Sequence, residues 1–402
     1  MSINFGLYAL IFLIPVALAA TIRAINRRGK QHTAIALLLL VIFLSPPLWP
    51  RFAPQTAWKQ EAFIPCRSLM AIDKDVLLLT GMGHPVYVLR RGKEGWEREA
   101  TFTYRDGEVV LARPNEYGST IADCKSIAKN LQGYDFSFFS SAGAVQDNAV
   151  FFVKRGIQSD GKGTGTIYTS VYDGDRWSKP IALPPLPNKN ADDIGSTLTV
   201  DENVLVNGDR GVVYVYERAS VTQPWLFKES ILSPRANGGY DFGHPVAVSG
   251  DTLVVGASSM GEGVSLFVRN AADGKWKFDT YLYPEDVPQT LPSGSRFGKS
   301  VDIQNDLIVV GASGMNFPDG VAFVYKRSRR TGKWKQVDKI KHIGGRPFWD
   351  LGRYFVTYGF GSEVNLSGNS IMISTGGGHN AERGLEGGEV FTHARIPFTN
   401  KW

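Results

Sequence analysis

One stretch of this chain occurs twice, and that repetition limits the possible folds more than any other feature. The first copy is DFGHPVAVSGDTLVVGAS and the second is RFGKSVDIQNDLIVVGAS. In each copy a Phe-Gly pair precedes a Gly-Ala pair by fourteen residues: Phe242-Gly243 and Gly256-Ala257, then Phe297-Gly298 and Gly311-Ala312. A repeat at this spacing indicates one supersecondary unit stacked several times.

Further copies of the unit open at Ile194-Gly195 and Phe360-Gly361, and fainter ones open at Phe138 and Cys66. Apolar and polar residues alternate in AVSGDTLVV and VDIQNDLIVV, which is typical of strands joined by a hairpin turn. A second β-rich run follows in each unit, and in most units a tryptophan comes next: Trp96, Trp177, Trp225, Trp276 and Trp334. We therefore predict an all-β fold in which four-stranded antiparallel units form the blades of a β-propeller.

The two ends of the predicted domain, residues 51–402, complement one another. The last unit stops after EVFTHARIP without a tryptophan strand, whereas AWKQEAFIP, containing Trp58, precedes the first unit. We expect this N-terminal strand to lie beside Glu389–Ile396 and complete the last blade, which gives six blades. The long interval from Trp96 to Trp177 leaves a seventh blade as the alternative.

These Phe-Gly and Gly-Ala pairs, with the apolar strand between them, resemble the FG-GAP repeats of integrin α-chain propellers and related bacterial surface proteins. The resemblance is good from Phe242 to Arg395. It implies a propeller, and family blades often carry a calcium loop after Gly-Ala. The matching loops here offer only Glu262 in one, and Asn316 and Asp319 in the other. Calcium takes about six to eight oxygen ligands, so we expect no metal and no other cofactor.

Residues 1–50 have a different character from the repeats. Two uncharged apolar runs, at about 4–22 and 33–48, flank a loop rich in Arg and Lys. A cleaved signal peptide is the alternative, but no positive residue precedes the first run and a second run follows it. We predict a transmembrane hairpin in the inner or plasma membrane, with the basic loop in the cytoplasm. Both termini and the propeller then lie in the periplasm or the extracellular space.

The cysteines, the net charge and the histidines limit the disulfides, partners and metal sites that this chain can be expected to have. Cys66 and Cys124 are the two cysteines, and one disulfide or two buried thiols remain equally open. The net charge of +6 is scattered, so we expect no nucleic-acid partner. His84 and His244 each stand in Gly-His-Pro without a second ligand at metal spacing, which favours positions in loops or blade junctions.

Two motifs between the expected third and fourth strands favour a structural role. YDGDRW, from Tyr172, and ADGKW, from Ala272, faintly resemble the Asp box of sialidase propellers. In such a box, Asp and Gly form the turn and the tryptophan fills the space between blades. No arginine cluster or acid pair of a sialidase can be assigned from the spacing of residues in this chain.

Two segments, Arg105–Gly133 and His342–Tyr358, fall outside the repeat. The second is rich in aromatic residues and arginine, a composition typical of interface anchors. An alternative is that these aromatics plug the channel or cover one blade. We predict a non-enzymatic module that binds a protein or glycan partner; a hydrolase or lyase acting on a polymer is the alternative. The candidate partner-binding residues are Arg346, Phe348, Trp349, Arg353 and Tyr354.

Overall fold

The fold is known from a computed structural model of the chain. The chain divides into two units, Met1–Glu61 and Ala62–Trp402, and every described residue belongs to the second. The described residues include no helix with the length and hydropathy of a membrane span. The predicted spans at 4–22 and 33–48 lie outside them. The structure describes residues 68–80, 85–92, 96–105, 108–112, 139–157, 163–186, 197–235, 239, 241–257, 263–286, 291, 294–315, 320–341, 359–367, 370–374, 378–380, 385–387 and 390–394.

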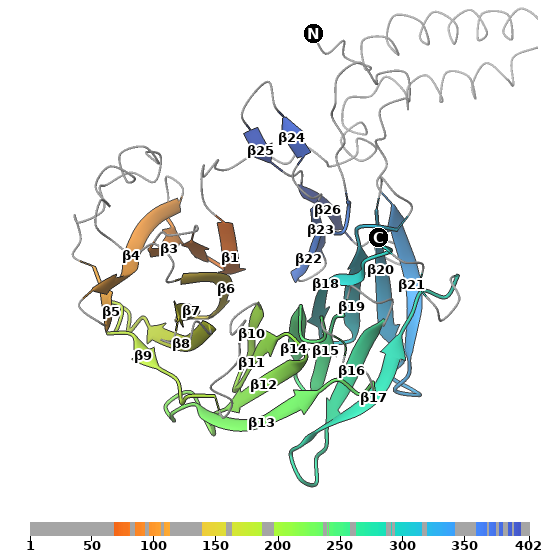
Figure 1. Ribbon diagram of the computed structural model, residues 1–402, viewed down its shortest axis with the longest axis horizontal. Coiled ribbons are helices and arrows are strands. Elements are labelled where there is room, and N and C mark those ends of the chain that lie inside the picture. The colour runs from red at the N-terminus through yellow and green to blue at the C-terminus, as the bar shows by residue number, and fades with distance from the viewer. Residues whose placement is uncertain are drawn as a thin grey trace, which may run out of the picture. The chain divides into compact units, whose positions relative to one another are not determined.

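The described part of the chain is all-β, as predicted, and its strands follow one another within six main antiparallel sheets (Figure 1). Sheet 1 contains β1 (Ser68–Asp73), β2 (Val76–Thr80), β3 (Val86–Arg91), β4 (Trp96–Arg105) and β5 (Glu108–Leu111). Sheet 2 contains β6 (Phe139–Gln146), β7 (Ala149–Ile157), β8 (Gly163–Val171) and β9 (Ile181–Ala182). Sheet 3 contains β10 (Thr197–Asp201), β11 (Val204–Asp209), β12 (Val212–Glu217) and β13 (Leu226–Leu232).

The remaining sheets repeat the same order. Sheet 4 contains β14 (Val246–Ser249), β15 (Thr252–Val255), β16 (Val264–Arg269) and β17 (Trp276–Leu282). Sheet 5 contains β18 (Phe297–Gln304), β19 (Leu307–Ala312), β20 (Val321–Arg327) and β21 (Trp334–Lys341). Sheet 6 contains β22 (Glu363–Ser367), β23 (Ser370–Ser374) and β26 (Val390–Ala394), and a separate hairpin joins β24 (Gly378–Asn380) to β25 (Leu385–Gly387).

Neighbouring sheets contact one another through their first strands. β1 contacts β6, β6 contacts β10, and the series continues through β14 and β18 to β22. The apolar cores lie between sheets, since each large cluster of buried residues combines side chains from two consecutive sheets. This repeated architecture is β-propeller-like, and it confirms the predicted four-stranded antiparallel unit.

In sheets 1 to 5, the first two strands are joined by a two-residue turn whose first residue has a positive φ. Such turns match the twist of the flanking strands. In three sheets the residue before this turn accepts a backbone N–H from the turn of the next sheet. These bonds run to Asp73 Oδ2 from Asp147 N (2.7 Å), to Asp201 Oδ2 from Gly250 N (2.5 Å), and to Ser249 Oγ from Asn305 N (3.1 Å).

The Phe-Gly and Gly-Ala pairs lie at the junctions between sheets. The glycine of the second strand in one sheet faces the Phe-Gly glycine of the next sheet. A Cβ built on Gly208 would lie 1.8 Å from the Gly243 carbonyl oxygen, and one on Gly311 would lie 2.1 Å from that of Gly361. Each Phe is fully buried beside this contact, as Phe242 shows at 1% exposure. The two dipeptides of the repeat therefore meet across units.

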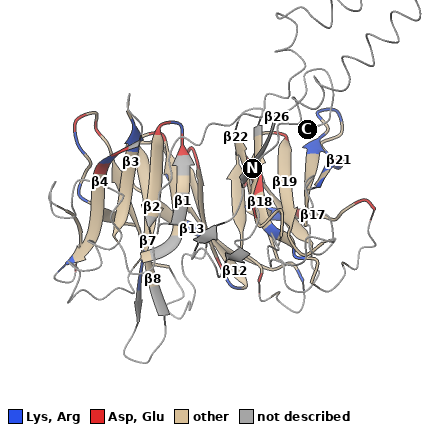
Figure 2. Cartoon of the chain, turned by 90° about the horizontal axis from the view of Figure 1, so that it is seen from above, with Lys and Arg blue, Asp and Glu red and all other residues tan. Residues whose placement is uncertain are grey.

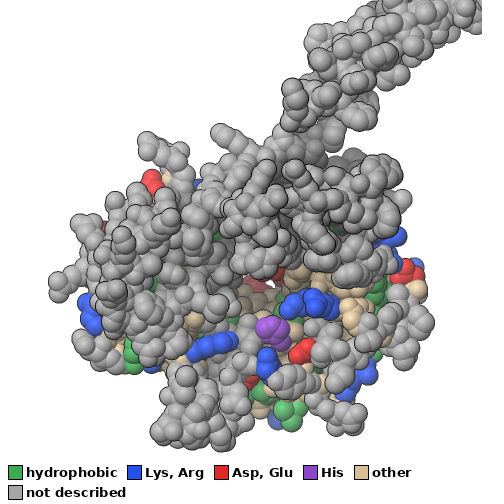
Figure 3. Space-filling view, turned by 45° about the horizontal axis from the view of Figure 1, so that its top comes forward, with side chains coloured by type: hydrophobic (Ala, Val, Ile, Leu, Met, Phe, Trp, Pro, Cys, Tyr) green, Lys and Arg blue, Asp and Glu red, His purple; other side chains and the backbone are tan. Residues whose placement is uncertain are grey.

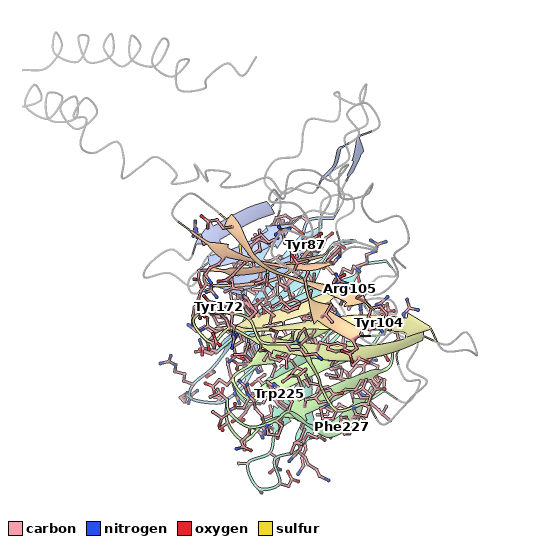
Figure 4. All side chains as sticks on the ribbon, turned by 90° about the vertical axis from the view of Figure 1, so that its left-hand side faces the viewer. Tyr87, Tyr104, Arg105, Tyr172, Trp225 and Phe227 are labelled. Atoms are coloured by element: carbon pink, nitrogen blue, oxygen red, sulfur yellow. The ribbon has the colours of Figure 1, made fainter. Side chains whose placement is uncertain are left out.

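Trp177 and Trp276, the tryptophans of the two Asp-box-like motifs, lie in the cores between sheets, as that interpretation predicts. Trp177 packs in the core shared with sheet 1, and its Nε1 donates to Glu99 Oε2 (3.0 Å). Trp225 packs against Phe151 of sheet 2 and lies beside the start of β13 (Figure 4). In the turn before Trp177, Asp173 Oδ1 accepts the backbone N–H groups of residues 175 and 176. These hydrogen bonds lower the pKa of Asp173.

Some sequence predictions differ from the structure or lie outside the described residues. GEVVLARP, in the long interval between Trp96 and Trp177, contributes β5, which is a fifth strand of sheet 1. The Gly-rich run SDGKGTGT has the composition of a hairpin loop, but its second half, from Gly163, forms the start of β8 because its backbone pairs with the long β7. Trp58, Cys66 and Cys124 lie outside the described residues, so ring closure, blade number and the disulfide remain predictions.

Candidate functional site

Strand direction gives each sheet two unlike edges. Because consecutive strands are antiparallel, the connections alternate between the two edges. One edge carries the two-residue turns and the short hairpins with tryptophan, and we call it the turn edge. The other carries the connections between the second and third strands of a sheet and the connections between sheets, and we call it the loop edge. Its connections include 233–245, 283–296 and 342–362. Figure 2 shows the strands from the side, with charged residues mostly near their ends.

The residues predicted from sequence to bind a partner lie outside the described residues. Arg346, Phe348, Trp349, Arg353 and Tyr354 follow β21 and precede β22. The described end of β21 and start of β22 are both at the loop edge. The structure therefore assigns the attachment points of this segment to the edge that carries the long connections, while the five side chains themselves stay a prediction.

Positively charged residues mark the loop edge of sheets 3, 4 and 5. Arg210 is exposed in the turn between β11 and β12, His244 is half-buried just before β14, and Arg296 is exposed just before β18. The Gly211 N–H donates to the Phe242 carbonyl (2.8 Å), so the first two positions belong to neighbouring chain segments. Figure 3 shows Lys and Arg side chains gathered beside a histidine on one face. His244 thus occupies a junction, as predicted from its sequence context.

An aromatic cluster with an arginine lies near the same edge of sheets 3 and 4. The Arg235 guanidinium lies 4.6 Å from the centre of the Tyr281 ring and donates to the Tyr283 hydroxyl. Phe278, 4.6 Å from Tyr281 between ring centres, is 41% exposed on β17. Arginine and aromatic residues with exposed ring surface are enriched where proteins bind one another. The sequence analysis did not single out this cluster, although the run FDTYLY on the last strand of its unit was visible.

The interface between sheets 2 and 3 becomes polar at the loop edge. Asn207, near the end of β11, is fully buried, and neither its Oδ1 nor its Nδ2 has a hydrogen-bond partner. Asp209 follows on the same strand at 3% exposure, and its Oδ1 accepts the Arg210 N–H (2.7 Å). Burial, and then the negative charge of Asp209, raise the pKa of Tyr214, which pairs with Asn207 across β11 and β12.

Sequence analysis did not identify Asn207 and Asp209 as candidate residues. The signal was present, because this unit has Val-Asn-Gly-Asp where two later units have Val-Val-Gly-Ala. Aligning the units position by position reveals the two polar replacements.

One partly buried carboxylate has a clear structural role. Asp302 Oδ2 accepts the Leu366 N–H from sheet 6 (2.6 Å), and Oδ1 accepts the Ile303 N–H (2.8 Å). Burial raises the pKa of Asp302 to about 6, although both hydrogen bonds oppose this change. Both oxygens hold backbone groups, so Asp302 links sheet 5 to sheet 6. In the described part of the chain, no group of three or more His, Cys, Asp or Glu side chains could hold a metal ion.

No protein-family model matches the chain, and no curated protein matches it either. Several solved structures resemble it in fold. A protein from Lactobacillus plantarum has a TM-score of 0.41 at 14% identity, over 77% of this chain and 74% of that one. A sialidase from Trypanosoma rangeli has a TM-score of 0.42 at 10% identity, over 81% of this chain and 54% of the sialidase. A Streptococcus pneumoniae sialidase has a TM-score of 0.37 at 10% identity, over 77% and 52%. Similarities at these scores support no conclusion about activity, substrate or partner.

Proposed function

We propose that this chain is a membrane-anchored, extracytoplasmic β-propeller that binds a protein or glycan partner without catalysing a reaction. Residues 1–50 form the hairpin anchor, and residues 51–402 form a six-bladed propeller of the FG-GAP type. The N-terminal strand with Trp58 completes its last blade. No cofactor, metal or nucleic acid takes part in this function.

The observation that supports this proposal is the difference between the two edges of the sheets, one with short turns and the other with long connections. The turn edge consists of short turns whose side chains hold adjacent sheets together, as Asp201 does for Gly250. The loop edge carries the long connections, the exposed Arg210 and Arg296, and the attachment points of the aromatic segment 342–358. Binding residues are concentrated on loops that a rigid scaffold positions. A scaffold that is rigid at one edge and variable at the other suits partner binding.

Site-specific photocrosslinking in native membranes tests the proposal. A photoreactive residue is placed in the full-length protein at Arg210 or Arg296 on the loop edge, and at Thr222 or Arg329 in hairpins of the turn edge. All four positions are exposed. We expect a discrete crosslinked species from the loop-edge positions and none from the turn-edge positions. Equal crosslinking from both edges, or none from the loop edge, would contradict the proposal.

A further inference from the structure

Asn207 breaks a rule that the other sheets follow. It is the fourth residue of the second strand of sheet 3. In the other five sheets this position is apolar and at most 4% exposed. The five residues are Leu79, Phe152, Val255, Val310 and Ile373. Sheet 3 therefore places a carboxamide where five equivalent positions contribute to the apolar core.

Neither polar atom of the Asn207 side chain has a partner, and the side chain has 0% exposure. A buried carboxamide without hydrogen bonds destabilises the folded state, because its bonds to water are lost and not replaced. A residue that lowers stability at a core position is expected where function requires it.

Asp209, two residues later, is a second buried polar residue at a position that is apolar in other sheets. Sheets 4 and 5 have Ala257 and Ala312 at this position, both buried, whereas Asp209 is a buried carboxylate. Side chains two apart on a strand share a face. Leu205, on that same face of β11, packs with Phe151 of sheet 2. Asn207 and Asp209 therefore both face sheet 2, at the end of β11 that reaches the loop edge.

We infer that Asn207 and Asp209 form a subsite, between sheets 2 and 3, for a neutral ligand that carries hydroxyl groups, such as a sugar residue. This inference rests on the proposed binding function and gives the class of its ligand. The carboxamide provides one acceptor and two donor hydrogens, and the carboxylate provides acceptors. Hydroxyl groups donate and accept, so they match this pair, whereas the negative charge of Asp209 disfavours an anion. The ligand approaches from the loop edge, since the exposed Arg210 directly follows Asp209.

The substitution Asn207→Val separates a binding role from a structural one, because Val already occupies this position in sheets 4 and 5. Thermal unfolding of the full-length protein in detergent is measured together with binding to a panel of neutral oligosaccharides derived from glucan, mannan and chitin. We expect the unfolding temperature of Asn207→Val to rise by a few degrees and its oligosaccharide binding to fall at least tenfold. Asp209→Ala should lose binding similarly. Asn148→Ser, at an exposed turn-edge position, is the control and should change neither.

Three results would overturn the inference. A lower unfolding temperature for Asn207→Val would show that the carboxamide supports the fold. Unchanged binding by both variants would remove the two side chains from the site. A wild-type protein that binds no oligosaccharide of the panel would show that the ligand class is wrong. Crosslinking from Arg210 would persist in each case if only the subsite were wrong, and would be absent if the proposed function were wrong.

Discussion

Single residues in this molecule show where its sequence compromises stability. Asp302 accepts two backbone N–H groups and joins sheet 5 to sheet 6, yet burial raises its pKa to about 6. Its ionised form is therefore less favourable in the folded chain than in the unfolded chain. The contribution of Asp302 thus depends on pH in the direction opposite to that of a carboxylate with a lowered pKa.

The pH dependence of Asp302→Asn follows from this raised pKa. The folded state holds the Asp302 proton more tightly than the unfolded state, so wild-type stability falls as the pH rises from about 4 to about 6. Asn keeps an oxygen that can accept the Leu366 N–H and has no charge. We expect the variant to be more stable than wild type by about 1–3 kcal/mol at pH 7.5, since one pKa unit corresponds to about 1.4 kcal/mol. Asp302 keeps part of its surface exposed, which favours the lower end of this range.

Chemical denaturation at pH 4 and pH 7.5 measures this difference. The two proteins should converge at pH 4, where Asp302 is protonated in the folded state. A variant that is less stable than wild type at both pH values would show that the hydrogen bonds of the carboxylate outweigh its desolvation.

Turn residues with positive φ give a second residue-scale prediction. Glu202 has φ 49° at the turn where Gly250 has φ 54° in the next sheet. A left-handed conformation costs a non-glycine residue about 1–2 kcal/mol. Replacing that residue by glycine removes this cost, but glycine also gives the unfolded chain more conformational freedom, which offsets part of the gain in stability. We expect Glu202→Gly to raise the unfolding free energy by about 0.5 kcal/mol. Gly250→Ala should lower it by about 1 kcal/mol, although no atom lies within 4 Å of the new Cβ. Equal effects of the two substitutions on stability would contradict this explanation.

At the scale of strands and sheets, the repeat is explained by close backbone contacts between units. Gly208 and Gly243 approach across the junction of sheets 3 and 4, and the Thr197 hydroxyl donates to the same Gly243 carbonyl (3.1 Å). The Ser300 hydroxyl donates to the Gly361 carbonyl in the same way (2.9 Å). The repeat motif is thus required by contacts that hold neighbouring sheets together.

Gly208→Ala tests that requirement. Its Cβ would lie 1.8 Å from the Gly243 oxygen, so sheets 3 and 4 must separate or distort. We expect a loss of about 3 kcal/mol in unfolding free energy, the upper part of the usual range for overpacking. Gly332→Ala is the matched control, since nothing lies within 4 Å of its Cβ and only its φ of +69° disfavours alanine. If the two substitutions cost the same, the contact does not limit side-chain size.

The strands of these units could be predicted from the sequence because the alternation of apolar and polar residues and the turn residues are local signals, which span only a few positions. The spacing of Phe-Gly and Gly-Ala was visible, but their contact across units depends on how sheets pack, which one unit does not encode. β5 joined sheet 1 because β4 is long enough to pair with it over Phe102–Arg105. Asn207 escaped notice because periodicity identifies a buried position, whereas the absence of a hydrogen-bond partner emerges only from three-dimensional packing.

At the scale of the whole molecule, the outer side of sheet 6 is the place where the predicted closure of the propeller can be tested. Sheets 2 to 5 each have four strands, whereas sheet 6 ends at β26 among the described residues. An outer strand with unpaired backbone groups readily pairs with another strand. AWKQEAFIP, with Trp58, resembles the tryptophan strands of the other units in sequence, and we predict that it pairs at this position.

Ring closure predicts that the segment with Trp58 stabilises the entire domain. A soluble form that begins at Arg51 should unfold in one cooperative transition, and a form that begins at Ser68 should unfold at a temperature lower by ten degrees or more. The loss is expected because, with the ring closed as predicted, the shorter form leaves the outer side of β26 unpaired, while its other side stays paired with β23, and opens the ring between sheets 6 and 1. A synthetic peptide covering residues 56–66 should restore part of the lost stability when it is added in excess, since a ligand of the folded state stabilises it by mass action. A peptide of the same composition in scrambled order serves as the control. Equal unfolding temperatures for the two forms would exclude closure by this strand, and with it the count of six blades.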